Sequence, residues 1–404
     1  MIQIVEKMLD VINAVDNSVF LSLSGQEQKK IVDAALKHQL GGVLYVKLRP
    51  ENKSSLINRD VFYLLESYWR TNAVKNMVLF HQLKDILEKF RENKINSMVL
   101  KGAYFADKLY PSIGSRPMSD IDILIYRKDQ KKADEILTKS GYYCRWNKTW
   151  IDKFHYHYGY FPPLKNQFFL EVHWLLAKPE PYFTQNIKNI FQRAEEYEIE
   201  GEKTKVMSPE DQVVYLSIHH AWSHCFSVNL IQLFDLVLIF EKLEIDLNKL
   251  VDISKQYHAE KAVYITLNVV NKLFINSIDS NVIKKLEPEN FPEYLSVAAV
   301  NIVLNRQQVL NTAFSRFMSR DKVYRKVFSL IKSVFPERKV LAEIYQLDSL
   351  SNVNLIHYMQ RLKDLVVKYR TTGLNYVFRK KNTRNVFDNE RIKNRMRNFL
   401  ISNF

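Results

Sequence analysis

Hydrophobic residues recur with two different periods along this chain, and the two periods occupy different stretches. Over 61–90 apolar residues recur every three or four positions, which predicts a long amphipathic helix with one buried face. Over 167–175 apolar and polar residues alternate, which is the period of a half-buried strand. Helical spacing returns after Ser208 and Pro209, a pair that suits a helix start. The pattern therefore predicts an α+β fold, in which a small mixed sheet is flanked by helical regions.

The same pattern divides the chain into four expected parts. They are an N-terminal helical region over 1–92, a mixed α/β segment over 93–204, a helical domain over 205–360 and a basic helical tail over 361–404. In the mixed segment we expect helices at 103–110 and 129–140, and strands at 95–100, 120–126, 142–146, 154–161 and 168–174. Gly141 follows the second of these helices and suits its C-terminal cap.

Two aspartates, Asp120 and Asp122, begin a strand that is otherwise apolar. Residues two apart in a strand point to the same face, so the two carboxylates project together. Close anions repel each other unless a cation lies between them, and magnesium, which binds carboxylate and phosphate oxygens, is the usual cation. Taken alone, the pair favours a plainer interpretation, in which the aspartates are solvated or one caps the next helix.

A candidate phosphate site precedes this pair, where the strand at 95–100 runs into Lys101, Gly102 and a helix. Glycine permits close approach of the backbone, the free N–H groups of a helix start favour anions, and lysine adds a positive charge. Alone, such a sequence is often only a turn. Downstream, the alternation places Glu171 and His173 on one face of their strand. Glu171 is then a natural third acid, although it could instead pair with a neighbouring Lys or Arg.

The order of these elements resembles the nucleotidyltransferase superfamily of the polymerase-β type. The resemblance rests on the Lys101–Gly102 turn, the run Arg116-Pro-Met-Ser-Asp-Ile-Asp122 and the later Glu171-Val-His-Trp174. More narrowly, the chain is similar to the bacterial family described as uncharacterised nucleotidyltransferases. In that family the catalytic domain is followed by helices, matched here by His219 to His224 and by Phe234-Asp235. The resemblance covers roughly residues 20–370 and is strongest over 95–240.

The resemblance implies transfer of a nucleoside monophosphate from a nucleoside triphosphate, with ATP the first choice, to an acceptor hydroxyl with release of pyrophosphate. It implies two magnesium ions held by Asp120, Asp122 and Glu171, with Glu171 either a third ligand or a base for the hydroxyl. Lys101 and Gly102 would hold the triphosphate. Many relatives carry Gly-Ser or Gly-Gly at that turn, so this chain departs from them there.

Two further residues beside the metal strand, Arg116 and Ser119, are candidates for phosphate contacts under the same resemblance. An ion pair within the loop is an equal alternative for Arg116. For His173, orientation of a carboxylate is favoured over direct metal ligation. His220 and His224 stand four apart, and we favour a core or site-lining role for them over a second metal site.

Three functions fit this sequence. The first is an enzyme that modifies a small molecule, such as a metabolite or peptide. The second applies the same chemistry to a macromolecule, such as tRNA or a toxin's protein target. The third is a nucleotide-binding module without activity. The three converging acids argue against the third.

Composition and charge add the cellular context. The two cysteines, Cys144 and Cys225, give no disulfide framework, and the N-terminus has no signal-peptide pattern, so we expect a cytoplasmic protein. The net charge is +15. Residues 361–404 contribute 12 − 3 = +9 of it, which would attract RNA or another polyanion unless it is only a solvated helix face.

Overall fold

The computed structural model describes residues 2–49, 56–146, 148, 151–152, 155–178, 183–275, 277–305, 331, 334–347, 349–377 and 381–402. The chain forms two compact units. The first comprises 1–145 and 157–305, and the second comprises 146–156 and 306–404. The division into four parts that the sequence suggests stays a prediction.

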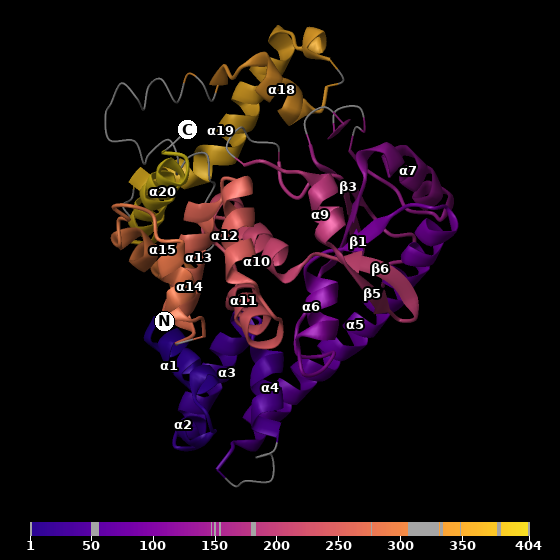
Figure 1. The fold of residues 1–404 in the computed structure, drawn as a ribbon. Coiled ribbons are helices and arrows are strands. Elements are labelled where there is room, and N and C mark those ends of the chain that lie inside the picture. The colour runs from indigo at the N-terminus through magenta and orange to yellow at the C-terminus, as the bar shows by residue number, and fades with distance from the viewer. Residues whose placement is uncertain are drawn as a thin grey trace. The chain divides into compact units, whose positions relative to one another are not determined.

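The first unit contains the sheet and most of the helices (Figure 1). Its strands are β1 (Ser97–Val99), β2 (Asp120–Ile125), β3 (His157–Tyr160), β4 (Phe169–His173), β5 (Glu195–Ile199) and β6 (Glu202–Val206). The helices up to the last strand are α1 (Ile2–Asn13), α2 (Ser18–Leu21), α3 (Gly25–Lys37), α4 (Gly41–Leu48), α5 (Arg59–Glu92), α6 (Gly102–Lys108), η2 (Arg127–Asp129), α7 (Gln130–Lys139) and α9 (Ile187–Arg193). Those after it are α10 (Pro209–Ser217), η3 (Ile218–Ser223), α11 (Leu230–Lys242), α12 (Leu247–Gln256), α13 (Glu260–Leu273), α14 (Ser280–Lys285) and α15 (Tyr294–Asn305).

The sheet is mixed, with the strand order β3-β4-β2-β1-β6-β5. The pairs β2·β4 and β1·β6 are parallel, and the other neighbours are antiparallel. The apolar residues of β2 are completely buried, which fixes this strand in the middle of the sheet. The α+β fold predicted from the hydrophobic pattern is confirmed.

The long helix α5 is the main support of the sheet. Asn58 caps it, because its Oδ1 accepts hydrogen bonds from the backbone N–H groups of Asp60 and Val61. Its buried face includes Leu79, Leu83 and Phe90, and the helix contacts β1, β2 and β6. The helix predicted from the apolar spacing at 61–90 is therefore present, slightly longer at both ends.

Two turns show how local sequence sets the strand positions. Gly141, with φ +86°, ends α7 as predicted, and the N–H groups of Gly141 and Tyr142 bond to Thr138 and Leu137 carbonyls. Glu200 and Gly201 both have positive φ and join β5 to β6 in a tight hairpin. The sequence pattern did not identify this hairpin. The strand predicted at 142–146 is wrong, because only Tyr143 forms a single bridge, to Phe161.

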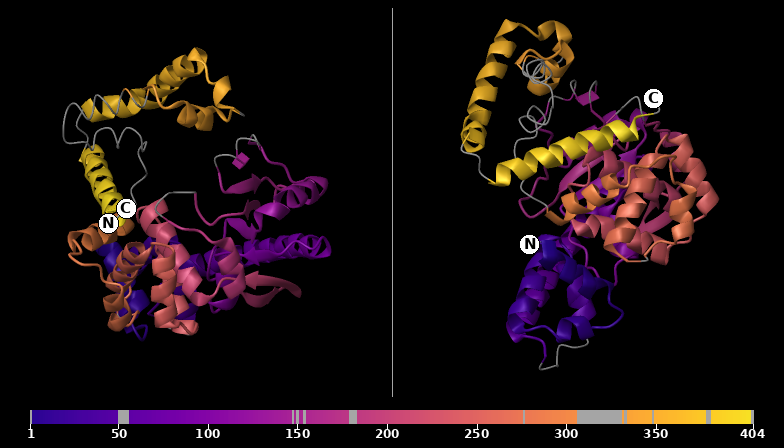
Figure 2. Two further views of the ribbon diagram at one scale, coloured as in Figure 1. Left: turned by 45° about the horizontal axis from the view of Figure 1, so that its top comes forward. Right: turned by 90° about the vertical axis from the view of Figure 1, so that its left-hand side faces the viewer.

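The N-terminal helices α1 to α4 pack together, and Figure 2 shows them as the indigo group. They are joined to the helices that follow the sheet, because α1 contacts α15 and the Asn13 side-chain amide donates to the Leu273 carbonyl at 3.0 Å. In the described part of the second unit lie α18 (Arg338–Tyr345), η4 (Leu350–Asn352), α19 (Leu355–Val377) and α20 (Lys381–Leu400). Leu341, Ala342 and Val353 form a small buried cluster there.

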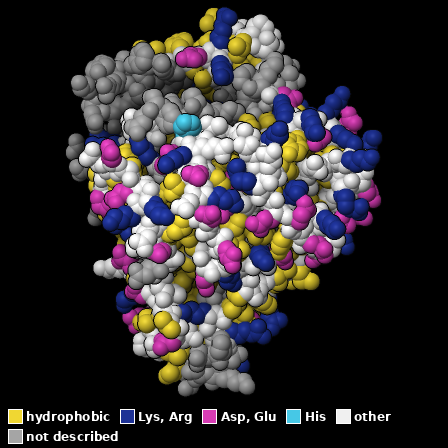
Figure 3. Space-filling view, in the orientation of Figure 1, with side chains coloured by type: hydrophobic (Ala, Val, Ile, Leu, Met, Phe, Trp, Pro, Cys, Tyr) yellow, Lys and Arg dark blue, Asp and Glu magenta, His cyan; other side chains and the backbone are white. Residues whose placement is uncertain are grey.

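None of the helices in the described ranges is long and apolar enough to cross a membrane. On the face drawn in Figure 3, Lys and Arg side chains are interspersed with Asp and Glu. The side chains of 368–390, which belong to the predicted basic tail, lie outside the described residues.

Candidate active site

The three acids that the sequence singled out lie on one face of the sheet. Strands β2 and β4 pair in parallel, with Asp122 opposite Glu171 and Asp120 opposite Phe169. Because side chains alternate along each strand, Asp120, Asp122 and Glu171 all project to the same side. The opposite side of β2 carries buried isoleucines. The structure therefore brings these acids together, as the two-residue spacing predicted.

Asp122 is the most enclosed of the three, with a side chain that is 8% exposed. Its Oδ1 lies 3.0 Å from His173 Nε2, and its Oδ2 lies 3.5 Å from Lys101 Nζ. Burial raises the pKa of the Asp122 carboxyl, but Lys101 and His173 outweigh burial and the pKa lies well below its usual range. Asp122 is therefore an anion held between two basic side chains.

Asp120 has a different environment, because its carboxylate forms no ion pair among the described residues, although the charge of Lys101 acts on it. Its Oδ1 accepts a hydrogen bond from the Ser119 hydroxyl at 3.0 Å. Burial and the negative charge of Asp122 raise the pKa of Asp120. The Ser119 hydroxyl thus faces its neighbouring carboxylate, and its predicted contact with phosphate stays a prediction.

Glu171 contacts two histidines on the same face. Its Oε2 lies 3.2 Å from His173 Nε2, and its Oε1 lies 3.8 Å from His157 Nε2. His173 therefore touches both Asp122 and Glu171 with one nitrogen, and the orienting role expected for it stays a prediction. His157 comes from β3, and the register of β3 against β4 brings it opposite His173 and to Glu171.

The turn between β1 and α6 places Lys101 against the acids. Lys101 has φ 45° and ψ −119°, a backbone conformation that favours glycine and is costly for lysine. Burial lowers the pKa of the Lys101 ammonium, but Asp122 and Tyr215 raise it more, so the net shift is upward. Its ammonium also lies 5.3 Å from the centre of the Tyr215 ring. Because α6 has only seven residues, Lys101 supplies more positive potential here than the helix dipole does.

Arg116 forms an ion pair, but its partner is Asp235 on α11 and not a residue of its own loop, and its predicted contact with phosphate stays a prediction. Its Nε and Nη2 donate to the two oxygens of Asp235 on α11 at 2.8 and 2.7 Å, and Tyr110 donates to the same carboxylate at 2.8 Å. The third nitrogen, Nη1, lies 2.8 Å from the position that a Cβ on Gly102 would take. A larger residue at Gly102 would therefore force Arg116, which Asp235 holds, to move. The ion pair between Arg116 and Asp235 connects the turn at Lys101 and Gly102 to helix α11.

Helix α10 and the following π-helix η3 line the site from the other side. In a π-helix residues five apart are aligned, and His219 and His224 are in contact, with 3.2 Å between their Nε2 atoms. This pairing replaces the one between His220 and His224 that helical spacing suggested. Burial and the charge of Lys101 hold the pKa of His219 well below its usual range, so His219 is neutral.

A small apolar pocket adjoins this region. Tyr215 forms part of its wall and also contacts Lys101, so the pocket lies next to the turn at Lys101 and Gly102. The other aromatic residues of the wall are Phe183, Trp222 and Tyr257. Aromatic walls of this kind suit a flat apolar group.

Comparison with known proteins gives a family match and one similar solved structure. The model of a family described as uncharacterised nucleotidyltransferase matches residues 24–275, more than half of the chain. None of the curated proteins matches. Among solved structures, the chain is similar to the antibiotic-resistance factor ANT(2'')-Ia, whose solution structure is described as revealing substrate-regulated conformation dynamics. That similarity has 12% identity and a TM-score of 0.32, and it covers 46% of this chain and 91% of the other.

The ion pair between Arg116 and Asp235 generates a stability prediction. Asp235→Ala leaves a buried guanidinium without its carboxylate, and we expect the free energy of unfolding to fall by about 3–5 kcal/mol in chemical denaturation. The double variant Arg116→Met/Asp235→Leu removes both charges and should recover most of that loss. A loss below about 1 kcal/mol in the single variant would show that the pair does not hold the turn to α11.

Proposed function

The chain belongs to the uncharacterised nucleotidyltransferase family, and from this premise we propose that it is a magnesium-dependent enzyme. It transfers a nucleoside monophosphate from a nucleoside triphosphate, with ATP as the first choice, to a hydroxyl of a small molecule. The observation that carries the proposal is the set of Asp120, Asp122 and Glu171 on one sheet face, with Lys101 beside them.

The donor chemistry of these acids fits magnesium. Carboxylate oxygens are the protein ligands that this ion prefers, together with phosphate oxygens of the substrate. The upward pKa shift of Asp120 is caused by burial and by Asp122, and it shows that Lys101 does not fully compensate the charge of this carboxylate. Asp120, Asp122 and Glu171 would hold the metal, which when bound would neutralise the triphosphate and polarise the α-phosphate.

The remaining residues position the substrates. Lys101 lies on the Oδ2 side of Asp122 and is the cation that would contact the triphosphate. The acceptor hydroxyl then gives its proton to a base, for which Glu171 is the candidate, and its oxygen bonds to the α-phosphorus. The bond between the α-phosphorus and the bridging oxygen breaks, and pyrophosphate leaves with the electron pair. Such a reaction needs little covalent help from the protein, so alignment and charge neutralisation are its main contributions. Asp235 engages two nitrogens of Arg116, and the third, Nη1, lies beside Gly102, where it would be a second cation for the triphosphate.

We place the apolar part of a small acceptor beside Tyr215, against the aromatic wall of the pocket, because the pocket itself has room for little more than a water-sized group. A macromolecular acceptor is the second candidate, and one observation favours it, the charge of +9 in residues 361–404.

Asp120 provides the most direct mutational test. We expect Asp120→Asn to lower the affinity for magnesium–ATP, measured by calorimetry, by roughly 100-fold or more. The rate of pyrophosphate release should fall by a similar factor. Because the folded protein raises the pKa of Asp120, its ionised form is destabilising at neutral pH, and the unfolding free energy should stay the same or increase. Asp122 is less suitable, because its removal leaves Lys101 and His173 without their carboxylate.

The matched control is Asp33→Asn, at an exposed position on α3, which should behave as the unchanged protein. Removal of magnesium with a chelator should abolish ATP turnover in the same assay. Full magnesium–ATP affinity in Asp120→Asn, or loss of its fold, would contradict the proposed role of the acids.

The pocket makes a separate prediction. If it receives the acceptor, Phe183→Ala should leave magnesium–ATP affinity within about twofold, since the nucleotide contacts lie at Lys101 and the acids. Calorimetry checks this. A loss of roughly tenfold or more would instead assign the pocket to the base of the nucleotide.

The macromolecular alternative predicts salt-dependent binding of tRNA that is lost when the chain is truncated before Arg361. Under the small-molecule proposal, truncation leaves tRNA retention unchanged at physiological salt. Filter binding at several salt concentrations separates the two outcomes, with magnesium–ATP binding as the check that the truncated chain is folded.

A further inference from the structure

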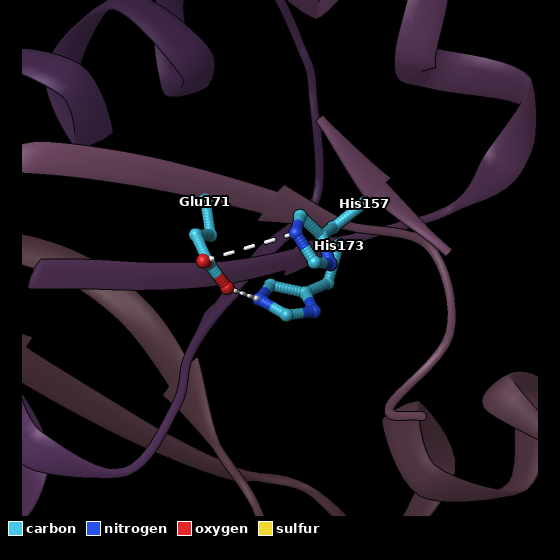
Figure 4. Close-up of side chains that lie close together, drawn as sticks. All are labelled: His157, Glu171 and His173. Carbon is cyan, nitrogen blue, oxygen red and sulfur yellow. Dashed lines mark ion pairs between the residues drawn. The ribbon is translucent and has the colours of Figure 1, made fainter. Parts of the chain in front are cut away.

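Two histidines near the acids have no part in the proposed transfer. In the antiparallel pair of β3 and β4, His157 lies directly opposite His173, and the ring centres are 4.8 Å apart. Glu171 lies two residues before His173 on the same face. Figure 4 shows the three side chains directed toward one another from the two strands.

The three residues carry ligand atoms close enough that small side-chain rotations would bring them onto one metal ion. One ligand atom from each of the three residues can be chosen so that all lie within 4.8 Å of one another. Two ligands that each lie about 2.1 Å from one ion are about 3.0–3.4 Å apart. The separation of His173 Nε2 and Glu171 Oε2, 3.2 Å, already falls in this range. The separation of His157 Nε2 and Glu171 Oε1, 3.8 Å, needs only a small side-chain rotation.

Exposure of the three side chains adds a second feature of a metal site. His173 is 2% exposed, whereas His157 is 16% and Glu171 is 24% exposed. The group is therefore anchored in the sheet on one side and open on the other. Three protein ligands with an open position are the usual arrangement of a metal that also binds water or substrate.

We propose that His157, Glu171 and His173 bind a divalent transition-metal ion, of the class of Mn²⁺, Co²⁺ and Zn²⁺. Imidazole nitrogens favour these ions, whereas magnesium prefers sites made of oxygen alone. The position is distinct from that of the magnesium acids but shares Glu171 with them. Binding of the ion stands independently of the proposed function, and only its use in catalysis rests on that function.

The proposed transition-metal ion can be located relative to the turn at Lys101 and Gly102. His173 contacts Oδ1 of Asp122, and Lys101 contacts the other oxygen, Oδ2. The mixed nitrogen–oxygen site thus lies on the side of Asp122 away from Lys101. If Lys101 holds the triphosphate, the transition-metal ion is on the side from which the acceptor approaches.

Cobalt provides a test that does not depend on turnover. The full chain, freed of metal with a chelator, is titrated with Co²⁺ while its ligand-field absorption in the visible region is recorded. We expect one equivalent to bind with the spectrum of mixed nitrogen and oxygen ligands. His157→Ala should weaken Co²⁺ binding by roughly tenfold or more and leave magnesium–ATP affinity within about twofold. His81→Ala, an exposed histidine on α5, is the matched control and should leave both unchanged.

The inference is overturned if Co²⁺ binds His157→Ala as tightly as the unchanged protein, or if no nitrogen-ligated spectrum appears. The second result would mean that His173 only donates hydrogen bonds to the two carboxylates. His157→Gln serves as a second variant if circular dichroism shows that the alanine variant is unfolded. If the protein binds magnesium–ATP but shows no nitrogen-ligated Co²⁺, only the transition-metal site is wrong. If it shows nitrogen-ligated Co²⁺ but binds no nucleotide, only the proposed function is wrong.

Discussion

The site depends on one buried anion, the carboxylate of Asp122. Burial of an unpaired carboxylate is costly, and here its two oxygens are met by His173 from β4 and Lys101 from the turn after β1. Neither partner is local, so the carboxylate is satisfied only when β1, β2 and β4 pair in the observed register. The unfavourable backbone conformation of Lys101 is consistent with this requirement, because the ammonium must turn back toward the strand.

A second buried ion pair extends the same constraint to the helical half of the first unit. Asp235 on α11 forms an ion pair with Arg116. Arg116 also lies against Gly102, in the turn after β1. The acids, the turn and α11 are therefore parts of one connected arrangement. The family match also continues beyond the sheet, to residue 275.

Local patterns predicted the parts of the fold that short-range physics determines. The two-residue spacing placed Asp120 and Asp122 on one face, helical periodicity identified α5, and Gly141 marked the end of α7. The hairpin of β5 and β6 was not identified, because its strands are rich in charged residues and carry a weak hydrophobic signal. Contacts between distant segments were also beyond the pattern: Arg116 and Asp235 are 119 residues apart. The approach of His157 to His173 depends on strand register, and that of His219 to His224 depends on a π-helix, which ordinary helical spacing does not suggest.

We propose that Asp120, Asp122, Glu171 and Lys101 form one site for magnesium and a nucleotide. The most direct measurement is a crystal structure of the full chain with magnesium and a non-hydrolysable ATP analogue. We expect metal bound to Asp120, Asp122 and Glu171, with the triphosphate in contact with Lys101 and the Gly102 backbone. A nucleotide bound elsewhere, or one bound in this place with the acids making no contact to metal, would contradict it.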